Sequence, residues 1–336
     1  MGKWPYRLVA ALLAAGMLAA GCGGKRTNDT SGASGDAAAA SCETGEGRIT
    51  IATGNSTGVY YALGGGLGQL ISDNTTLRAN AAETGASVQN IQQLVAGDYD
   101  VAFSLADTAA DAATGKGPFE GKPQPIRALT RLYPNYTHVV VRADSGINSV
   151  ADMRGKRIST GSPKSGTEVI AQRLLQAAGL DPEKDVQAQR LDLTKTVDGM
   201  KDGSIDGLFW SGGLPTAAMT DLTTSLGDRV KFLDVTPLLD TMKQINPVYD
   251  TAIIPAATYQ LPADVPTIVV PNVLLVREDF PANNACALTK LIFDRKADLE
   301  RVHPAAKDIT LDTAAKTDPV QLHPGSRRAL DELNAG

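Results

Sequence analysis

Two short loops rich in glycine, serine and threonine are the residues of this sequence best suited to chemistry. The first is Gly54-Asn55-Ser56-Thr57-Gly58, and the second runs from Gly161 to Thr167 as GSPKSGT. Each loop follows β-forming residues and precedes apolar residues at helical spacing, which predicts a strand, a tight turn and a helix start. Such a turn exposes backbone N–H groups at the positive end of a helix, and these groups suit a polar or anionic small molecule.

The surroundings of the two loops repeat along the chain. Gly54 and Gly161 lie 107 residues apart, and Asp100 and Asp206, in the later part of each unit, lie 106 apart. Two separately chosen pairs of landmarks give nearly the same offset, which indicates two copies of one α/β unit. We therefore expect an α/β fold of two similar lobes joined by a hinge. The loops should lie at the C-terminal ends of strands, where open α/β sheets bind ligands, and face an interlobe cleft.

The two loops and the strands beside them predict a ligand site in that cleft. Backbone N–H groups of residues 54–58 and 165–167 should contact opposite ends of one ligand. For each aromatic side chain alone core packing is the more common role, and Trp210, at the end of a strand, is the best candidate exception. The predicted ligand-binding residues are Gly54, Asn55, Ser56, Thr57, Gly58, Tyr60, Tyr61, Ser87, Asn90, Ser104, Ser162, Ser165, Gly166, Thr167, Trp210 and Ser211.

The first loop also satisfies G-x-S-x-G, the pattern of a hydrolase nucleophile on a strand-to-helix turn. A catalytic triad would need an acid and then a histidine later in the chain. The only histidines are His138, His303 and His323, which lie beside proline, in a predicted strand or near the C-terminus. Repeated glycine turns explain the motif without catalysis. We expect no enzymatic activity, and a serine hydrolase using Ser56 is the alternative.

Other cofactor chemistries fit the sequence poorly. The second loop has Thr167 where a phosphate-binding loop has lysine, which argues against a nucleotide hydrolase. No cluster of Cys, His and carboxylate residues has metal-ligand spacing, so we expect neither a metal nor a cofactor. A formal net charge of −5 argues against nucleic-acid binding.

The N-terminus predicts export. Residues 1–21 combine Lys3 and Arg7 with an apolar run too short to span a bilayer. The run ends in LAAGC, similar to a bacterial lipobox, so Cys22 is a candidate for acylation and for a lipid anchor on the outer face of the membrane. Ordinary leader cleavage with a free Cys22 is the alternative. Residues 22–46 are mostly small and polar, which predicts a flexible tether.

Two cysteines are left in the exported part, Cys42 and Cys286. An exported chain with two remaining cysteines favours a disulfide, and Cys42 lies just before the first predicted strand. Two unrelated buried thiols are the alternative, because sequence cannot place their Cα atoms.

Longer elements complete the expected lobes. Residues 126–132 and 138–142 read as two strands around Tyr133-Pro134-Asn135, residues 265–277 as a return strand, and residues 282–302 as one amphipathic helix. We expect lobe I to comprise residues 47–136 and 268–336, and lobe II residues 137–267.

Four segments together resemble a known family. They are ATGNSTGVYYALGGGLGQLI, ETGASVQNIQQLVAGDYDVAFSLADTA, STGSPKSGTEVIAQRLLQAAGL and DGLFWSGGLPTAAM. They look like the TAXI branch of TRAP-transporter solute-binding proteins, over residues 48 to about 300. The first loop departs from the family at Asn55, where glycine is usual.

The resemblance implies a type II periplasmic-binding-protein fold whose lobes close on a small organic acid or amino acid, such as glutamate or 2-oxoglutarate. It implies delivery of this anionic or zwitterionic solute to a sodium-driven membrane permease. We expect a monomer. A ligand sensor for a membrane signalling partner is an alternative with the same cleft.

Overall fold

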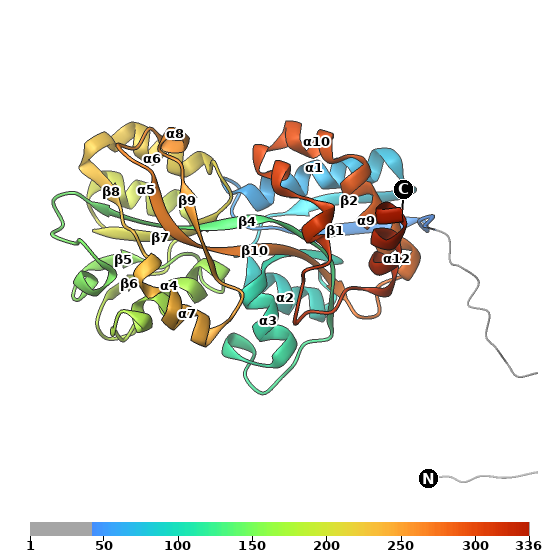
Figure 1. Ribbon diagram of the computed structural model, residues 1–336, viewed down its shortest axis with the longest axis horizontal. Coiled ribbons are helices and arrows are strands. Elements are labelled where there is room, and N and C mark those ends of the chain that lie inside the picture. Colours follow the sequence, from blue (N-terminus) through green and yellow to red (C-terminus); the bar gives the residue numbers. More distant parts are fainter. Residues whose placement is uncertain (1–41, 336) are drawn as a thin grey trace, which may run out of the picture. The chain divides into compact units, whose positions relative to one another are not determined.

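A ten-stranded mixed sheet runs through residues 42–335, the part of the chain that this computed structural model describes (Figure 1). The strands follow the order β2-β1-β3-β10-β4-β7-β5-β6, with β8 paired to β4 and β9 to β10. Their bounds are β1 Gly47–Ala52, β2 Leu77–Ala82, β3 Val101–Leu105, β4 Ile126–Arg142, β5 Arg157–Ser159, β6 Gln187–Gln189, β7 Gly207–Gly212, β8 Val230–Phe232, β9 Asp250–Ile254 and β10 Val265–Arg277.

Helices connect these strands and pack on both faces of the sheet. Successive side chains of a strand point to opposite faces, so Ile51 of β1 packs in one apolar cluster and the adjacent Ala52 in another. The α-helices are α1 Val59–Asn74, α2 Ser87–Ala96, α3 Ala106–Thr114, α4 Gly166–Ala177, α5 Leu193–Asp202, α6 Ala217–Leu226, α7 Leu239–Ile245, α8 Ala256–Tyr259, α9 Ala282–Asp294, α10 Lys296–Val302, α11 Leu311–Ala314 and α12 Pro324–Ala335.

The internal repeat of the sequence is also a repeat of strand register. Ala52 of β1 pairs with Ala82 of β2 in parallel, and Ser159 of β5 pairs with Gln189 of β6 in parallel. Each residue of the second pair lies 107 positions after its counterpart. The two halves of the sheet, β1–β3 with their helices and β5–β7 with theirs, are therefore copies of one unit.

The paired aspartates of the repeat have the same local role. The Asp100 carboxylate accepts the Thr50 N–H at 2.8 Å, and the Asp206 carboxylate accepts the Arg157 N–H at 2.8 Å. Each aspartate thus holds the beginning of its strand to the first strand of its unit. A carboxylate bonded to a backbone N–H near a strand end replaces a missing ladder partner.

Two long strands join the halves. β4 and β10 pair antiparallel and run side by side from one half to the other in Figure 1. The prediction of two strands around Tyr133-Pro134-Asn135 is wrong, because β4 continues through them. Pro134 lies opposite Pro271, and the register shifts just after this pair. Two residues that both lack an N–H leave no ladder donor unpaired when they face each other, so the strand tolerates the proline.

The prediction of one long helix over residues 282–302 is also wrong, because the segment forms two helices, α9 and α10. Arg295 leaves helical geometry with φ −112° and ψ 24°, and its carbonyl accepts the N–H groups of Asp298 and Leu299. Both Ile292 before the break and Leu299 after it are buried in the same cluster. The apolar periodicity therefore continues across the break, and it conceals the break from sequence reading.

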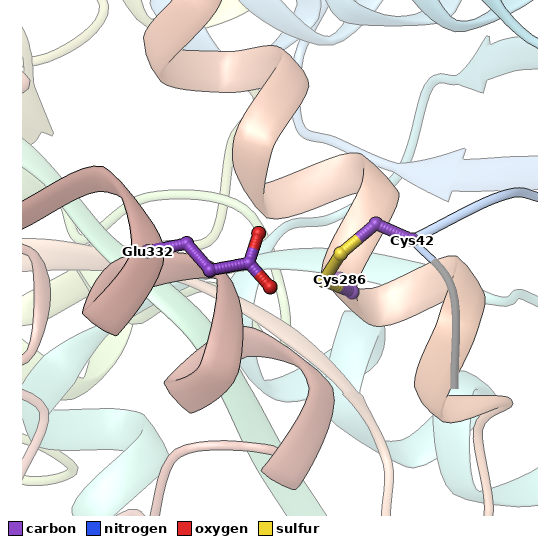
Figure 2. Close-up of side chains that lie close together, drawn as sticks. All are labelled: Cys42, Cys286 and Glu332. Carbon is purple, nitrogen blue, oxygen red and sulfur yellow. A yellow bond between two sulfur atoms is a disulfide. The ribbon is translucent and has the colours of Figure 1, made fainter. Parts of the chain in front are cut away.

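The residues before β1 are attached to the body. Cys42 forms a disulfide with Cys286 of α9, with Cα atoms 5.1 Å apart (Figure 2). The Thr44 carbonyl accepts the Thr76 hydroxyl at 3.1 Å, and the Gly45 N–H donates to the Asn284 side chain at 3.2 Å. Residues 42–46 were expected in the tether, and these contacts show that they are part of the folded body.

Residues 42–335 lie within one compact unit, so the division into lobes at residues 136–137 and 267–268 stays a proposal. The leader over residues 1–21, the acylation of Cys22 and most of the tether lie outside the described residues. Within residues 42–335, no helix is long and apolar enough to cross a membrane.

Candidate functional site

A pocket lies where the loops of the two halves meet. It encloses about 30 Å³, room for one or two water molecules. Its lining consists of loop and helix-start residues, of strand ends and of two residues in the middle of β4. The lining residues are Gly54, Asn55, Gly58, Val59, Tyr60, Gly85, Ala86, Ser87, Leu105, Tyr133, Asn135, Ser162, Ser165, Gly166, Thr167, Trp210, Ser211, Gly212 and Gly213.

Most of the residues predicted to bind a ligand are among them. The first loop contributes through its ends and the second loop through its serines and helix start. The predicted residues in the lining are Gly54, Asn55, Gly58, Tyr60, Ser87, Ser162, Ser165, Gly166, Thr167, Trp210 and Ser211.

Five predicted residues lie outside the lining. Ser56 and Tyr61 are exposed, and the Ser56 N–H donates to Glu83 at 2.8 Å. Thr57 is half-buried beside them. Asn90 and Ser104 are fully buried with other roles: the Asn90 amide donates to two backbone carbonyls, and the Ser104 hydroxyl donates to the Leu105 carbonyl at 2.9 Å. A buried amide must be satisfied internally, and Asn90 therefore supports the site without facing it.

Sequence reasoning missed several lining residues. The most informative are Tyr133 and Asn135, which the sequence analysis treated as part of a connection between strands. A tyrosine and an asparagine flanking a proline inside an apolar stretch could have indicated a functional position. The other missed residues are Val59, Gly85, Ala86, Leu105, Gly212 and Gly213.

Three helices begin at the pocket. The starts of α1, α2 and α4 contribute Val59, Ser87 and Gly166 to the lining. No side chain caps α1 or α2, whereas Ser165 caps α4 by accepting the Glu168 N–H at 2.9 Å. The N–H of Gln89 in α2 donates to the Lys164 carbonyl of the other half at 3.0 Å. The partial positive charge at the three helix starts favours a negative group in the pocket.

None of the lining residues carries a charged side chain. The two tyrosines are neutral donors, because burial raises the pKa of Tyr60 and of Tyr133 well above the usual value. The Tyr60 hydroxyl donates to Asn272 of β10. The pocket is therefore a neutral polar site in the field of three helix starts, which favours anions over cations.

Asn55 links the two halves directly. Its amide donates to the Ser162 hydroxyl at 3.2 Å, and its carbonyl oxygen accepts the N–H of Leu193, the first residue of α5, at 3.2 Å. Ser162 lies 107 residues after Asn55, so the two are equivalent positions of the repeat. The side chain that departs from the resembled family therefore bridges the halves at the edge of the pocket.

A second set of hydrogen bonds holds Trp210. The indole N–H donates to the Thr216 hydroxyl at 3.1 Å, and the Thr216 N–H donates to the Tyr259 hydroxyl at 2.9 Å. Tyr259 also contacts Nε2 of His138 at 3.1 Å, while Nδ1 of His138 lies 3.0 Å from the Tyr136 carbonyl. The ring of Trp210 is thereby fixed against Gly58 of the other half.

Neither a hydrolase triad nor a metal centre is assembled within residues 42–335. His138, His303 and His323 bond to partners other than Ser56, and none lines the pocket. Among the residues that the structure describes, the one cluster with metal-ligand spacing is Cys42, Cys286 and Glu332, and both of its sulfur atoms form the disulfide (Figure 2).

Solved structures share this architecture. One from Bordetella bronchiseptica RB50 is 18% identical, covers 85% of this chain and 98% of its own, and has a TM-score of 0.55. A structure described as a periplasmic transporter is 13% identical, covers 86% of this chain and 93% of its own, and has a TM-score of 0.50. The alkanesulfonate-binding protein SsuA from Xanthomonas axonopodis pv. citri, bound to MOPS, is 15% identical. It covers 86% of this chain and 85% of its own, with a TM-score of 0.47.

These likenesses concern the fold. The two duplicated α/β units joined by β4 and β10 form a type II periplasmic-binding-protein fold, as predicted from the sequence. The model of the NMT1-like family matches residues 51–333, and the chain belongs to that family.

Proposed function

We propose that this protein is an extracytoplasmic solute-binding protein that captures a small organic anion between its two halves. The observation that carries the proposal is the convergence of three helix starts, at Val59, Ser87 and Gly166, on a pocket without charged side chains. Such a site stabilises a buried negative charge through backbone N–H groups and helix dipoles.

Capture requires the halves to move. The pocket has room for one or two water molecules, which is too little for an organic acid of several heavy atoms. β4 and β10 are the two strands that join the halves, and bending at them would open the pocket to solvent. A solute that contacts both loops binds the closed arrangement more tightly than the open one. It therefore shifts the equilibrium toward the closed arrangement.

We propose that the protein delivers its solute to a TRAP-type membrane permease. This rests on the resemblance of the loop segments to the TAXI branch, whose ligands include glutamate and 2-oxoglutarate. The lipobox-like LAAGC supports a lipid anchor at Cys22. Processing of a Cys22→Ala variant like the wild type would contradict the anchor, and a signalling protein captured in place of a permease would favour the sensor alternative.

The direct test is to identify the solute. The full chain, purified without added ligand, is denatured, and the released small molecules are identified by mass spectrometry. The identified molecule is then added back in a thermal unfolding assay. An anion present at a hundred times its Kd should raise the free energy of unfolding by about 2.7 kcal/mol. Binding of only cationic or neutral molecules would contradict the proposal.

The hydrolase alternative has its own test. Ser56 is exposed and has no histidine partner among the hydrogen bonds of residues 42–335. We expect no ester turnover by the wild type. Turnover that disappears in Ser56→Ala would restore the alternative.

A further inference from the structure

Two polar atoms of the pocket have no hydrogen-bond partner within residues 42–335. They are the hydroxyl of Tyr133 and Oδ1 of Asn135. Tyr133 is fully buried and Asn135 is 2% exposed. Both lie on β4, the strand that crosses between the halves, and both line the pocket.

A buried polar atom without a partner is costly, so each of these atoms calls for a partner that enters the pocket. Tyr133 offers one O–H donor. Asn135 has one end of its amide bonded to the Ser211 hydroxyl at 3.2 Å, which leaves its other end for the pocket. Whichever way the amide is turned, Asn135 offers a single polar atom. A hydroxyl group on the solute could accept from Tyr133 and donate to Oδ1 of Asn135. A carbonyl group could accept from Tyr133 and, with the amide turned, also from Asn135.

An ammonium group could donate to Oδ1 of Asn135, but it would find no carboxylate to balance its charge. The lining contains no carboxylate. The buried acids nearby are already paired: Asp107 and Asp111 of α3 form ion pairs with Arg173 of α4, and Glu168 of α4 forms one with Arg190. Burying a cation against neutral acceptors and three positive helix ends is strongly unfavourable.

We propose that the pocket selects small oxyanions bearing a hydroxyl or carbonyl group and no ammonium group, with Tyr133 and Asn135 as the residues that determine this selectivity. The inference rests on the proposed function and narrows it.

The test compares matched sets of acids by isothermal titration calorimetry on the full chain. One set is glutarate, 2-oxoglutarate, 2-hydroxyglutarate and glutamate. A second is propionate, pyruvate, lactate and alanine, and a third is ethanesulfonate, 2-hydroxyethanesulfonate and 2-aminoethanesulfonate. In the set that binds, the amino member should bind at least about a hundredfold more weakly than the hydroxyl or carbonyl member.

Variants test the two residues. Tyr133→Phe removes a hydroxyl that has no internal partner, so the fold should be retained. Tyr133→Phe and Asn135→Ala should each reduce the preference for the hydroxyl or carbonyl member over the unsubstituted acid by about tenfold. The affinity of the unsubstituted acid should change less than that of the hydroxyl or carbonyl member. Tyr259→Phe is the matched control, because its hydroxyl bonds to Thr216 and His138 outside the lining. It should lower stability and, by loosening Trp210, change the affinities of all members of a set alike, so that the selectivity stays the same.

The outcomes separate the two claims. Tight binding of the amino member, or unchanged selectivity in both pocket variants, would overturn the inference and leave anion capture standing. Failure of every anion to bind while other solutes bind would overturn the proposed function and the inference together.

Discussion

Gly166 is the position where a single side chain would most directly oppose closure. A Cβ there would lie 2.5 Å from Cδ1 of Leu105 and 2.7 Å from Oγ of Ser87, both in the other half. We expect Gly166→Val to fold, because the halves can move apart, but to lose solute binding. Circular dichroism should be unchanged, while the solute-induced thermal shift and decrease in radius of gyration should disappear.

Gly66 provides a control with the same substitution. Its Cβ would lie 2.8 Å from Cγ2 of Val302, where α1 contacts α10 away from the pocket. Gly66→Val should lower the free energy of unfolding by roughly 1–3 kcal/mol through overpacking, and it should keep the solute-induced thermal shift. If Gly166→Val binds the solute with the affinity of the wild type, the second loop is not part of the binding site.

His138 gives the stability of the fold a pH dependence. Burial lowers the pKa of His138 to about 4, against an ordinary value of 6.5. Below pH 6.5 the unfolded chain binds a proton at this residue before the folded chain does. The stability that the neutral His138 contributes to the folded state is therefore fully present above pH 6.5. As the pH falls toward 4, the free energy of unfolding decreases by on the order of 3 kcal/mol.

Urea unfolding between pH 4.5 and 7.5 measures this contribution. His138→Phe should be less stable at pH 7.5, because it loses the bonds to Tyr136 and Tyr259, but its stability should fall less with decreasing pH. Some dependence of stability on pH should remain in the variant, because burial also lowers the pKa values of His303 and His323. Parallel curves for the variant and the wild type would contradict the assignment.

At the scale of elements, an ion cluster joins α3 of one half to α4 of the other. Nη1 of Arg173 lies 2.9 Å from Oδ2 of Asp107, and its Nη2 contacts Asp111. The Tyr249 hydroxyl, just before β9, also bonds to Arg173 and Asp107. Burial opposes the charge on Arg173, but Tyr249 and the two carboxylates raise the pKa of the guanidinium.

Removing the cation should be more harmful than removing the whole cluster. Arg173→Met leaves two buried carboxylates without a cationic partner and should lower the free energy of unfolding by about 3–5 kcal/mol. The triple variant Asp107→Asn, Asp111→Asn, Arg173→Met leaves no buried charge and should recover much of that loss. Urea unfolding measures both, and a triple variant no more stable than Arg173→Met would show that packing, not charge, dominates.

At the scale of the whole molecule, the disulfide connects the residues before β1 to α9 across a separation of 244 residues. The chain-entropy estimate for so long a loop is on the order of 5 kcal/mol, with measured values often smaller. Cys42→Ser with Cys286→Ala should lower the thermal unfolding midpoint without changing solute affinity, because the bridge lies away from the pocket lining. Two free thiols in the unreduced wild-type protein, measured by alkylation and mass spectrometry, would show that the bridge does not form.

The sequence by itself determined the repeated unit and most of its elements. Strand, glycine turn and helix start are local features, since turn residues and apolar periodicity act over a few neighbours. The offset between Gly54 and Gly161 reappears in the strand register of the two halves. For the same reason the ends of both loops, at Gly54 and Gly166, could be assigned to one pocket.

Tertiary structure decided which side chains reach that pocket. Asn90 and Ser104 are polar and close in sequence to lining residues, yet each turns to satisfy buried backbone carbonyls. Tyr133 and Asn135 enter the pocket only because β4 continues past Pro134, which depends on Pro271 of a distant strand. Whether a side chain faces a pocket or a neighbouring carbonyl depends on contacts between segments far apart in the chain, and such contacts leave no local pattern in the sequence.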